Sequence, residues 1–196
     1  MAVFAWRKRN DAAADVEEEA PADILVHGNQ IYFYAEVTRE SVLRLVEKLL
    51  VLRDQNPKYI TLFLHSEGGD LHAGLGAVDH IRCLGVEVRT VIDGFVASAA
   101  TLIYLAGTKR YVMPNANVLI HQLSTEFWGK FQDLEDEMAN SQALMKRIKS
   151  IYKSETVMPS KDIRTLLKRE MYLSADQCIE YGIAHSVFRR KKVRSK

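Results

Sequence analysis

The sequence has few of the residues and segments that mark secreted, metal-binding and membrane proteins. Its 196 residues include four prolines and two cysteines, Cys83 and Cys178. The cysteines lie far apart and lack the paired spacing of a metal site, so we expect two buried thiols in a reducing compartment. No run of about 18 apolar residues occurs, and residues 1–10 are too short and too charged for a signal peptide. We therefore expect a cytoplasmic protein with no membrane partner and no bound metal.

A strong charge of one sign occurs only at the C-terminus. The last eight residues hold six of the 27 Lys and Arg and no acidic residue, so the rest of the chain, with 25 Asp and Glu, has a net charge of −4. A mildly acidic body argues against a nucleic-acid partner. We interpret residues 189–196 as a basic, solvated C-terminal tail, although such a tail can also touch RNA, DNA or a membrane surface.

Length and patterning predict one folded α/β domain. A chain of 196 residues is long enough for one sizeable core. Residues 1–22 have little to bury and are expected to form a flexible N-terminal tail, which leaves residues 23–188 as the folded domain. Alternating strand and helix patterns predict crossovers and a largely parallel sheet. The expected strands cover 30–35, 59–65, 86–92, 109–113, 117–121 and 183–188, and the expected helices cover 38–53, 71–84, 97–106, 129–154, 159–168 and 174–181.

The helix expected at 129–154 is unusually long and has one apolar face. Its apolar residues recur three, four and seven positions apart: Phe131, Leu134, Met138, Met145, Ile148 and Tyr152. Two interpretations remain open. The whole face packs on the body, or the helix is an arm that contacts a second subunit.

Ser98 is the leading candidate for a nucleophile. It lies between a glycine-bearing turn and an apolar, helix-forming segment, a setting that can expose one hydroxyl beside free helix-start N–H groups. A serine at a helix start is, by itself, more often a cap. A serine nucleophile needs a base, for which His121 at the end of a buried strand is the best candidate and His65 its rival. An orienting carboxylate completes such a site, and the sequence offers Asp93, Asp162, Glu170 and Asp176.

The glycine pair Gly68-Gly69 follows another buried strand. Glycine lets the backbone approach a ligand closely and adopt a positive φ. A free N–H at Gly68, together with the N–H of Ala99 after the nucleophile, would form a two-donor oxyanion hole. A plain tight turn is the alternative interpretation.

Taken in order, these motifs resemble those of the ClpP family, the proteolytic subunits of the Clp protease. The resemblance covers roughly residues 59–187 and includes His65-Ser-Glu-Gly-Gly-Asp70, Gly94-Phe-Val-Ala-Ser-Ala-Ala100, Met113-Pro-Asn115, Ile120-His-Gln122 and Tyr172-Leu-Ser-Ala175. It implies a crotonase-like α/β fold of repeated ββα units with a protruding handle helix, in a handle region at about 122–154. It also implies a homo-oligomer of two stacked heptameric rings that enclose the active sites.

The resemblance also implies a role for each site residue. Ser98 matches the nucleophile, His121 the general base, and Gly68 and Ala99 the oxyanion-hole amides. The family's triad aspartate falls at Glu170, which is one methylene longer. The implied activity is that of a serine endopeptidase acting on peptides or unfolded proteins without a cofactor. A Clp-type ATPase unfoldase is a candidate partner.

Several departures from the family pattern keep other functions open. Glu67 and Leu123 stand where the family has prolines, segment 124–129 replaces the glycine-rich start of the handle, and no recognisable axial loop occurs near the N-terminus. With Glu170, these departures motivate an alternative, a catalytically weak or inactive ring subunit with a structural or regulatory role. Acyl-CoA chemistry on the same fold is disfavoured, because it needs an oxyanion hole but no Ser–His pair.

Overall fold

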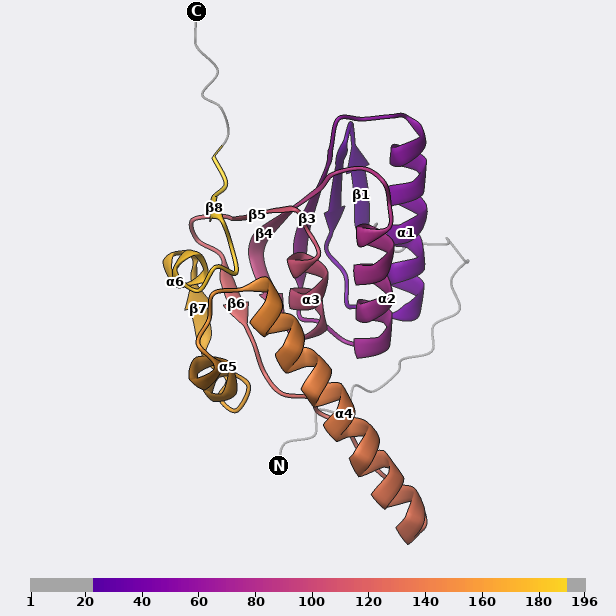
Figure 1. Cartoon of the computed structure of the whole chain (residues 1–196). Helices are drawn as coiled ribbons and strands as arrows, with labels where there is room; N and C mark the ends of the chain where they lie inside the picture. The colour runs from indigo at the N-terminus through magenta and orange to yellow at the C-terminus, as the bar shows by residue number, and fades with distance from the viewer. Residues whose placement is uncertain (1–22, 190–196) are drawn as a thin grey trace, which may run out of the picture.

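The structure, a computed structural model, describes residues 23–189 (Figure 1). Its strands are β1 (Ile24–His27), β2 (Gln30–Phe33), β3 (Ile60–Ser66), β4 (Val88–Ala97), β5 (Lys109–Val112), β6 (Asn117–Leu119), β7 (Tyr172–Ser174) and β8 (Ser186–Val187). Its helices are α1 (Arg39–Asp54), α2 (Leu71–Arg82), α3 (Ala99–Leu105), α4 (Phe131–Glu155), α5 (Ser160–Leu166) and α6 (Ala175–Glu180). The tail expected at 1–22 and all but the first residue of the tail expected at 189–196 lie outside the described residues.

A largely parallel sheet forms the centre of the fold. The strand order is β1-β2-β3-β4-β5-β8, in which β1 is antiparallel to β2 and the other neighbours are parallel. β6 pairs in parallel with the end of β4, and β7 pairs antiparallel with β6. The predicted α/β crossovers are confirmed, because parallel neighbours require long connections. The sequence pattern does not predict β1 or β7, the two short antiparallel strands.

β4 is longer than the strand expected at 86–92, and it changes partner along its length. Its first part pairs with β5, whereas residues 95–97 pair with β6. The register with β3 shifts after Leu64, and Gly94 lies in the displaced stretch with φ +82°. This backbone conformation is one that glycine adopts without strain, so Gly94 bends the strand instead of ending it. β4 therefore runs on to the residue before Ser98.

Helix α1 begins at a well-formed cap and covers the sheet with an apolar face. The Ser41 N–H donates to Thr38 Oγ1 (3.1 Å), and the Thr38 N–H donates to Ser41 Oγ (2.9 Å). The buried residues of α1 are Ser41, Val42, Leu45, Val46, Leu49 and Leu52. This confirms most of the apolar stripe expected at 38–53, but Leu50, also expected there, is exposed. The opposite face of the sheet carries aromatic side chains, with Tyr32 and Phe63 stacked at 4.6 Å.

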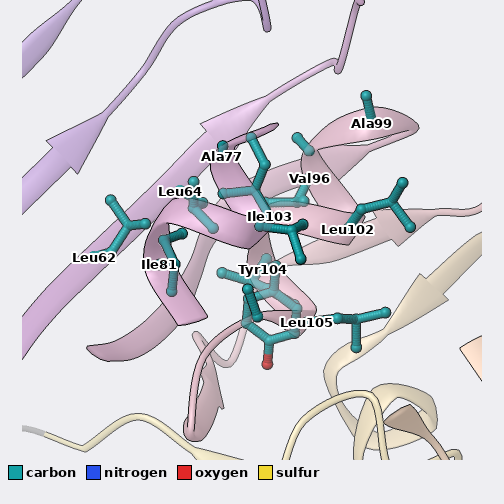
Figure 2. Packing of buried hydrophobic residues seen from close by; sticks show 14 of the residues in the cluster. Leu62, Leu64, Ala77, Ile81, Val96, Ala99, Leu102, Ile103, Tyr104 and Leu105 are labelled. Carbon is teal, nitrogen blue, oxygen red and sulfur yellow. The ribbon is translucent and has the colours of Figure 1, made fainter. Parts of the chain in front are cut away.

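Helix α3 is buried along its whole length. Figure 2 shows its side chains among those of β3, β4 and α2, with Ile103 and Tyr104 in the middle of the cluster. A helix enclosed on all sides is held by packing rather than by propensity. The start of α3, directly after Ser98, is therefore fixed by the core of the domain.

Helix α4 extends away from the body (Figure 1). Only Ile148 and Tyr152, near its C-terminal end, are buried. Phe131 is 74% exposed and Met138 is 52% exposed. Packing on the body is thus confirmed only for the last turns, while the rest projects as an arm would. None of the helices in the described ranges is long and apolar enough to cross a membrane.

The two cysteines occupy different environments. Cys178 is buried in α6, and burial raises the pKa of its thiol to about 12. Cys83 is exposed, so the expectation of two buried thiols is wrong for this residue. The reason is its position as the C-cap of α2, where the chain turns at the surface.

Candidate active site

One cavity brings together the residues that the sequence nominates for catalysis. It has a volume of about 510 Å³ and lies where β3, β4 and β6 end. The carboxyl ends of parallel strands are where open α/β sheets usually bind ligands. The residues that line it are Glu36, Glu67, Gly68, Gly69, Leu71, Ser98, Ala99, Leu102, His121, Gln122, Leu123, Ser124, Ile148 and Tyr152. Four of the five predicted site residues are in this set, and Glu170 is not.

Ser98 occupies the N-cap position of α3 but does not act as a cap. Its backbone has φ 53° and ψ −129°, and its side chain makes no capping hydrogen bond. A positive φ at a residue other than glycine costs about 1–3 kcal/mol and occurs where the surroundings impose it. The Ser98 N–H donates to the Leu119 carbonyl (3.1 Å), which ties the turn to β6. The hydroxyl is thus left free beside the cavity.

The glycine pair packs directly against this turn. A Cβ on Gly68 would lie 2.5 Å from the Ser98 Cβ and 3.0 Å from the Ala99 nitrogen, so no larger residue fits. Gly68 donates its N–H to Ser66 Oγ at 3.2 Å. Within residues 23–189, the N–H groups of Gly69 and Ala99 have no hydrogen-bond partner. The pattern Gly-Gly indicates a close approach, but which of its two amides stays free depends on how the loop turns.

His121 and Glu170 come together through the pairing of β6 with β7. Leu119 is opposite Tyr172 at the end of this antiparallel register, and His121 and Glu170 each lie two residues beyond it. Both residues line a second cavity of about 170 Å³. The hydrogen bonds within residues 23–189 include none between Ser98 and His121 or between His121 and Glu170. The three side chains are neighbours through two adjoining cavities but are not hydrogen-bonded to one another.

The rival candidates from the sequence lie elsewhere. His65 does not line the large cavity, and its Nδ1 is 2.8 Å from the carbonyl oxygen of Asp93. The Asp93 carboxylate accepts a hydrogen bond from the Tyr34 hydroxyl (2.5 Å). Burial and this carboxylate both raise the pKa of the Tyr34 phenol. Asp162 in α5 and Asp176 in α6 line neither cavity beside His121. Of the four carboxylates that the sequence offers, only Glu170 lines a cavity together with His121.

Two carboxylates, Glu36 and Glu67, border the cavity, and no Lys or Arg of residues 23–189 lines it. Neither forms an ion pair within the part of the chain that the structure describes. Glu36 is brought here by the bridge between Val37 and Gly69, and its Cγ would lie 3.1 Å from a Cβ on Gly69. No motif marks Glu36 in the sequence. The same described residues hold no cluster of three His, Cys, Asp or Glu suited to a metal ion.

Comparison with known proteins identifies the family. A family model described as Clp protease matches residues 15–191. The chain is 32% identical over 187 residues to the ATP-dependent Clp protease proteolytic subunit 1 of Corynebacterium glutamicum, covering 93% of this chain and 90% of that protein. The structure matches a ClpP1 mutant from Listeria monocytogenes with a TM-score of 0.76 and 28% identity, over 84% of this chain and 93% of the other. The expected ClpP-like fold is confirmed, and the chain belongs to the Clp protease family.

Proposed function

We propose that the protein is a serine endopeptidase that cleaves peptides or unfolded proteins, with Ser98 as nucleophile, His121 as general base and Glu170 as the residue that orients His121. Membership of the Clp protease family supports a peptidase. One observation carries the assignment to Ser98. Its hydroxyl caps no helix and its backbone has a strained positive φ. Ser98 lines one cavity with His121, Gly69 and Ala99, and the last two have N–H groups without a partner in the described residues.

The reaction is acyl transfer in two halves. The Ser98 oxygen attacks the carbonyl carbon of the scissile bond while the His121 imidazole accepts the hydroxyl proton. The C–N bond then breaks, the imidazolium passes this proton to the leaving amine, and an ester on Ser98 remains. Water attacks the ester after giving a proton to the same imidazole, and that proton returns to the serine oxygen. No cofactor takes part in this sequence.

The negative charge that develops on the carbonyl oxygen needs N–H donors. Ala99 supplies one candidate, because its amide follows the nucleophile and is unpaired in the described part of the chain. The sequence nominates Gly68 for the second donor. Gly69 is the stronger candidate, since the Gly68 N–H already donates to Ser66 while the Gly69 N–H has no partner among residues 23–189.

The imidazole has to approach both partners for this chemistry. Catalytic hydrogen bonds are often long in the absence of substrate and shorten in the reacting complex. Glu170 is exposed and follows the end of α5, so its longer side chain can reach toward His121 from across the second cavity. A glutamate can take the orienting role of an aspartate in serine hydrolases.

The proposal includes an assembly. Proteins of the Clp protease family form oligomeric rings, and the exposed apolar residues of α4 suit contact with a second copy. We infer a homo-oligomer of stacked heptameric rings built from residues 23–188, with the handle region at 122–154 between subunits and a Clp-type ATPase as a candidate cytoplasmic partner. Light scattering that gives a monomer near 22.3 kDa at every concentration would contradict this.

Covalent labelling tests the nucleophile. A fluorophosphonate probe is expected to label the wild type and the control S154A, whose serine is exposed on α4 away from the cavity, but not S98A. Equal labelling of all three would overturn the assignment of Ser98. Intact mass of the labelled protein, with the modified peptide located by fragmentation, identifies the residue that reacts.

A second function, a ring subunit without activity of its own, is favoured by the absence of hydrogen bonds among Ser98, His121 and Glu170 in the described structure. The two functions separate in one assay. Purified, assembled protein that neither labels nor cleaves, but that increases the activity of a partner subunit on mixing, would support the structural or regulatory role.

A further inference from the structure

A buried hydrogen-bond chain connects helix α4 to the turn that carries Ser98. Thr101 Oγ1 donates to the Ser98 carbonyl oxygen at 2.6 Å, and the Tyr152 hydroxyl is hydrogen-bonded to the same Thr101 oxygen. Both side chains belong to residues that are 2% exposed. The Thr101 N–H also donates to the Ser98 carbonyl (3.0 Å), so this oxygen is held from two directions by one residue.

The donor and acceptor in each hydrogen bond of this chain follow from the protons available. A threonine hydroxyl has a single proton, and Thr101 donates it to the Ser98 carbonyl. The Tyr152 hydroxyl must then be the donor to Thr101. Burial raises the pKa of the Tyr152 phenol, so its proton is retained at neutral pH. The order Tyr152 to Thr101 to the Ser98 carbonyl is fixed.

The Ser98 carbonyl shares a peptide plane with the N–H of Ala99. A peptide unit is rigid, so the direction of its C=O determines the direction of its N–H. Ser98 has φ 53°, a conformation that relaxes unless neighbouring groups hold it. Two hydrogen bonds to the carbonyl therefore also hold the Ala99 N–H, which is the candidate donor to the oxyanion.

We propose that Thr101 and Tyr152 are positioning residues for peptide hydrolysis: they hold the Ser98–Ala99 peptide plane so that the Ala99 N–H faces the oxyanion. This rests on the proposed function, because it presumes acyl transfer at Ser98. Tyr152 also lines the cavity, and its hydroxyl supports the turn. The packing of α4 on the body thereby becomes a condition for a correctly oriented amide.

Conservative variants separate positioning from stability. Y152F and T101V remove one hydroxyl each with little change of volume, and T101S keeps the hydroxyl but removes the methyl group. Y104F is the matched control, because Tyr104 is 1% exposed and its hydroxyl donates to the Tyr111 carbonyl (3.1 Å), away from the cavity. The readouts are kcat and KM for a fluorogenic peptide, the rate of fluorophosphonate labelling, the oligomeric state and Tm.

We expect Y152F and T101V to lower kcat and the labelling rate about 10-fold or more, with KM changed less than about 3-fold, since one oxyanion donor is worth about 10²–10³ in rate. The double variant Y152F/T101V should be no slower than T101V, because both substitutions break the same hydrogen-bond chain. T101S should stay within about 3-fold of the wild type. Y104F should lower Tm as much as Y152F does without lowering kcat.

The outcomes are distinguishable. An active wild type whose kcat is unchanged in Y152F and T101V would overturn this inference alone, as would a loss in T101S equal to that in T101V or an equal loss in Y104F. A wild type that neither labels nor cleaves any peptide would overturn the proposed function and this inference with it. If T101V does not assemble, the comparison of Y152F with Y104F decides the question.

Discussion

The Cα of Gly68 packs against the Ser98 side chain so closely that a Cβ on Gly68 would lie 2.5 Å from the Ser98 Cβ. The same Cβ would lie 2.8 Å from the Ala97 carbonyl oxygen, and Gly68 has φ +96°. The contacted atoms are backbone or directly attached to it, so they cannot move without moving the turn. The requirement for glycine therefore comes from the site itself.

G68A is expected to lower kcat at least about 100-fold, because a displacement of about 1 Å at reacting groups has this effect. A fluorogenic peptide assay and fluorophosphonate labelling measure the loss. G76A is the control, since a Cβ on Gly76 meets nothing within 4 Å and alanine favours the interior of α2. G76A should retain its activity and gain up to about 1 kcal/mol of unfolding free energy. Wild-type activity in G68A would contradict the close approach.

Replacement of Glu170 tests the orienting carboxylate. E170Q keeps the shape but loses the charge that stabilises an imidazolium, and we expect kcat to fall about 10³-fold. E170D keeps the charge with one methylene fewer and should stay within about 10-fold of the wild type. If E170Q is as active as the wild type, His121 has no carboxylate partner at this position.

The acidic border of the cavity predicts a preference for cationic substrates. Glu36 and Glu67 line the cavity without a cationic partner in the described residues, so a Lys or Arg of a bound peptide would meet uncompensated negative charge. Exposed ion pairs contribute about 0.2–1 kcal/mol each, so E67Q should lower kcat/KM for Arg-containing peptides about two- to fivefold. Neutral peptides should be unaffected.

Salt provides the check on this preference. The difference between Arg-containing and neutral peptides should shrink as ionic strength rises, because the Debye length falls to about 3 Å at 1 M salt. If E67Q affects both peptide classes equally at low salt, Glu67 acts by shaping the loop and not through its charge.

Arg110 should contribute strongly to stability. Its side chain donates to the backbone carbonyls of Glu155 (2.7 Å), Ile183 (2.9 Å) and Gly182 (3.1 Å), and thus joins the end of α4 to the segment after α6. R110M would leave these acceptors without their donor, at a cost of about 3–5 kcal/mol. Urea denaturation measures the loss.

The matched control for this change is R82M. Arg110 and Arg82 both contact the Glu155 carboxylate (3.4 Å and 2.7 Å), but the Arg82 side chain is 43% exposed. An exposed pair contributes at most about 1 kcal/mol, so the loss of unfolding free energy in R82M should be several-fold smaller than that in R110M. Equal losses in the two variants would show that the Glu155 carboxylate, and not the carbonyls, is what Arg110 stabilises.

The sequence predicts the elements whose pattern is local. The apolar stripe of α1, the turn before Ser98 and the strand before His121 each leave a signal within a few residues, and each is found close to its expected range. β1 and β7 leave little signal, because each is short and is held by one antiparallel neighbour. The end of β4 is misplaced because Gly94 indicates a turn, whereas the partner strands hold it in a bend.

The residues of the site, too, are predicted where they belong to a local sequence pattern. Ser98, His121 and the glycine pair belong to short motifs, and the cavity brings them together. Glu36 reaches the cavity only through its neighbour's bridge to Gly69, and Tyr152 only through the packing of α4. Such contacts join segments far apart in sequence, so no local pattern records them.

Helix α4 is attached to the body only near its C-terminal end, so most of its length projects. Between Phe131 and the buried Ile148, where packing on the body begins, the helix runs about 25 Å, at 1.5 Å per residue. A tilt of about 5° at Ile148 would therefore move the free end by about 2 Å. Under the proposed positioning role of Tyr152, a contact at the tip of α4 would act on the peptide plane beside Ser98 through the buried last turns of the helix.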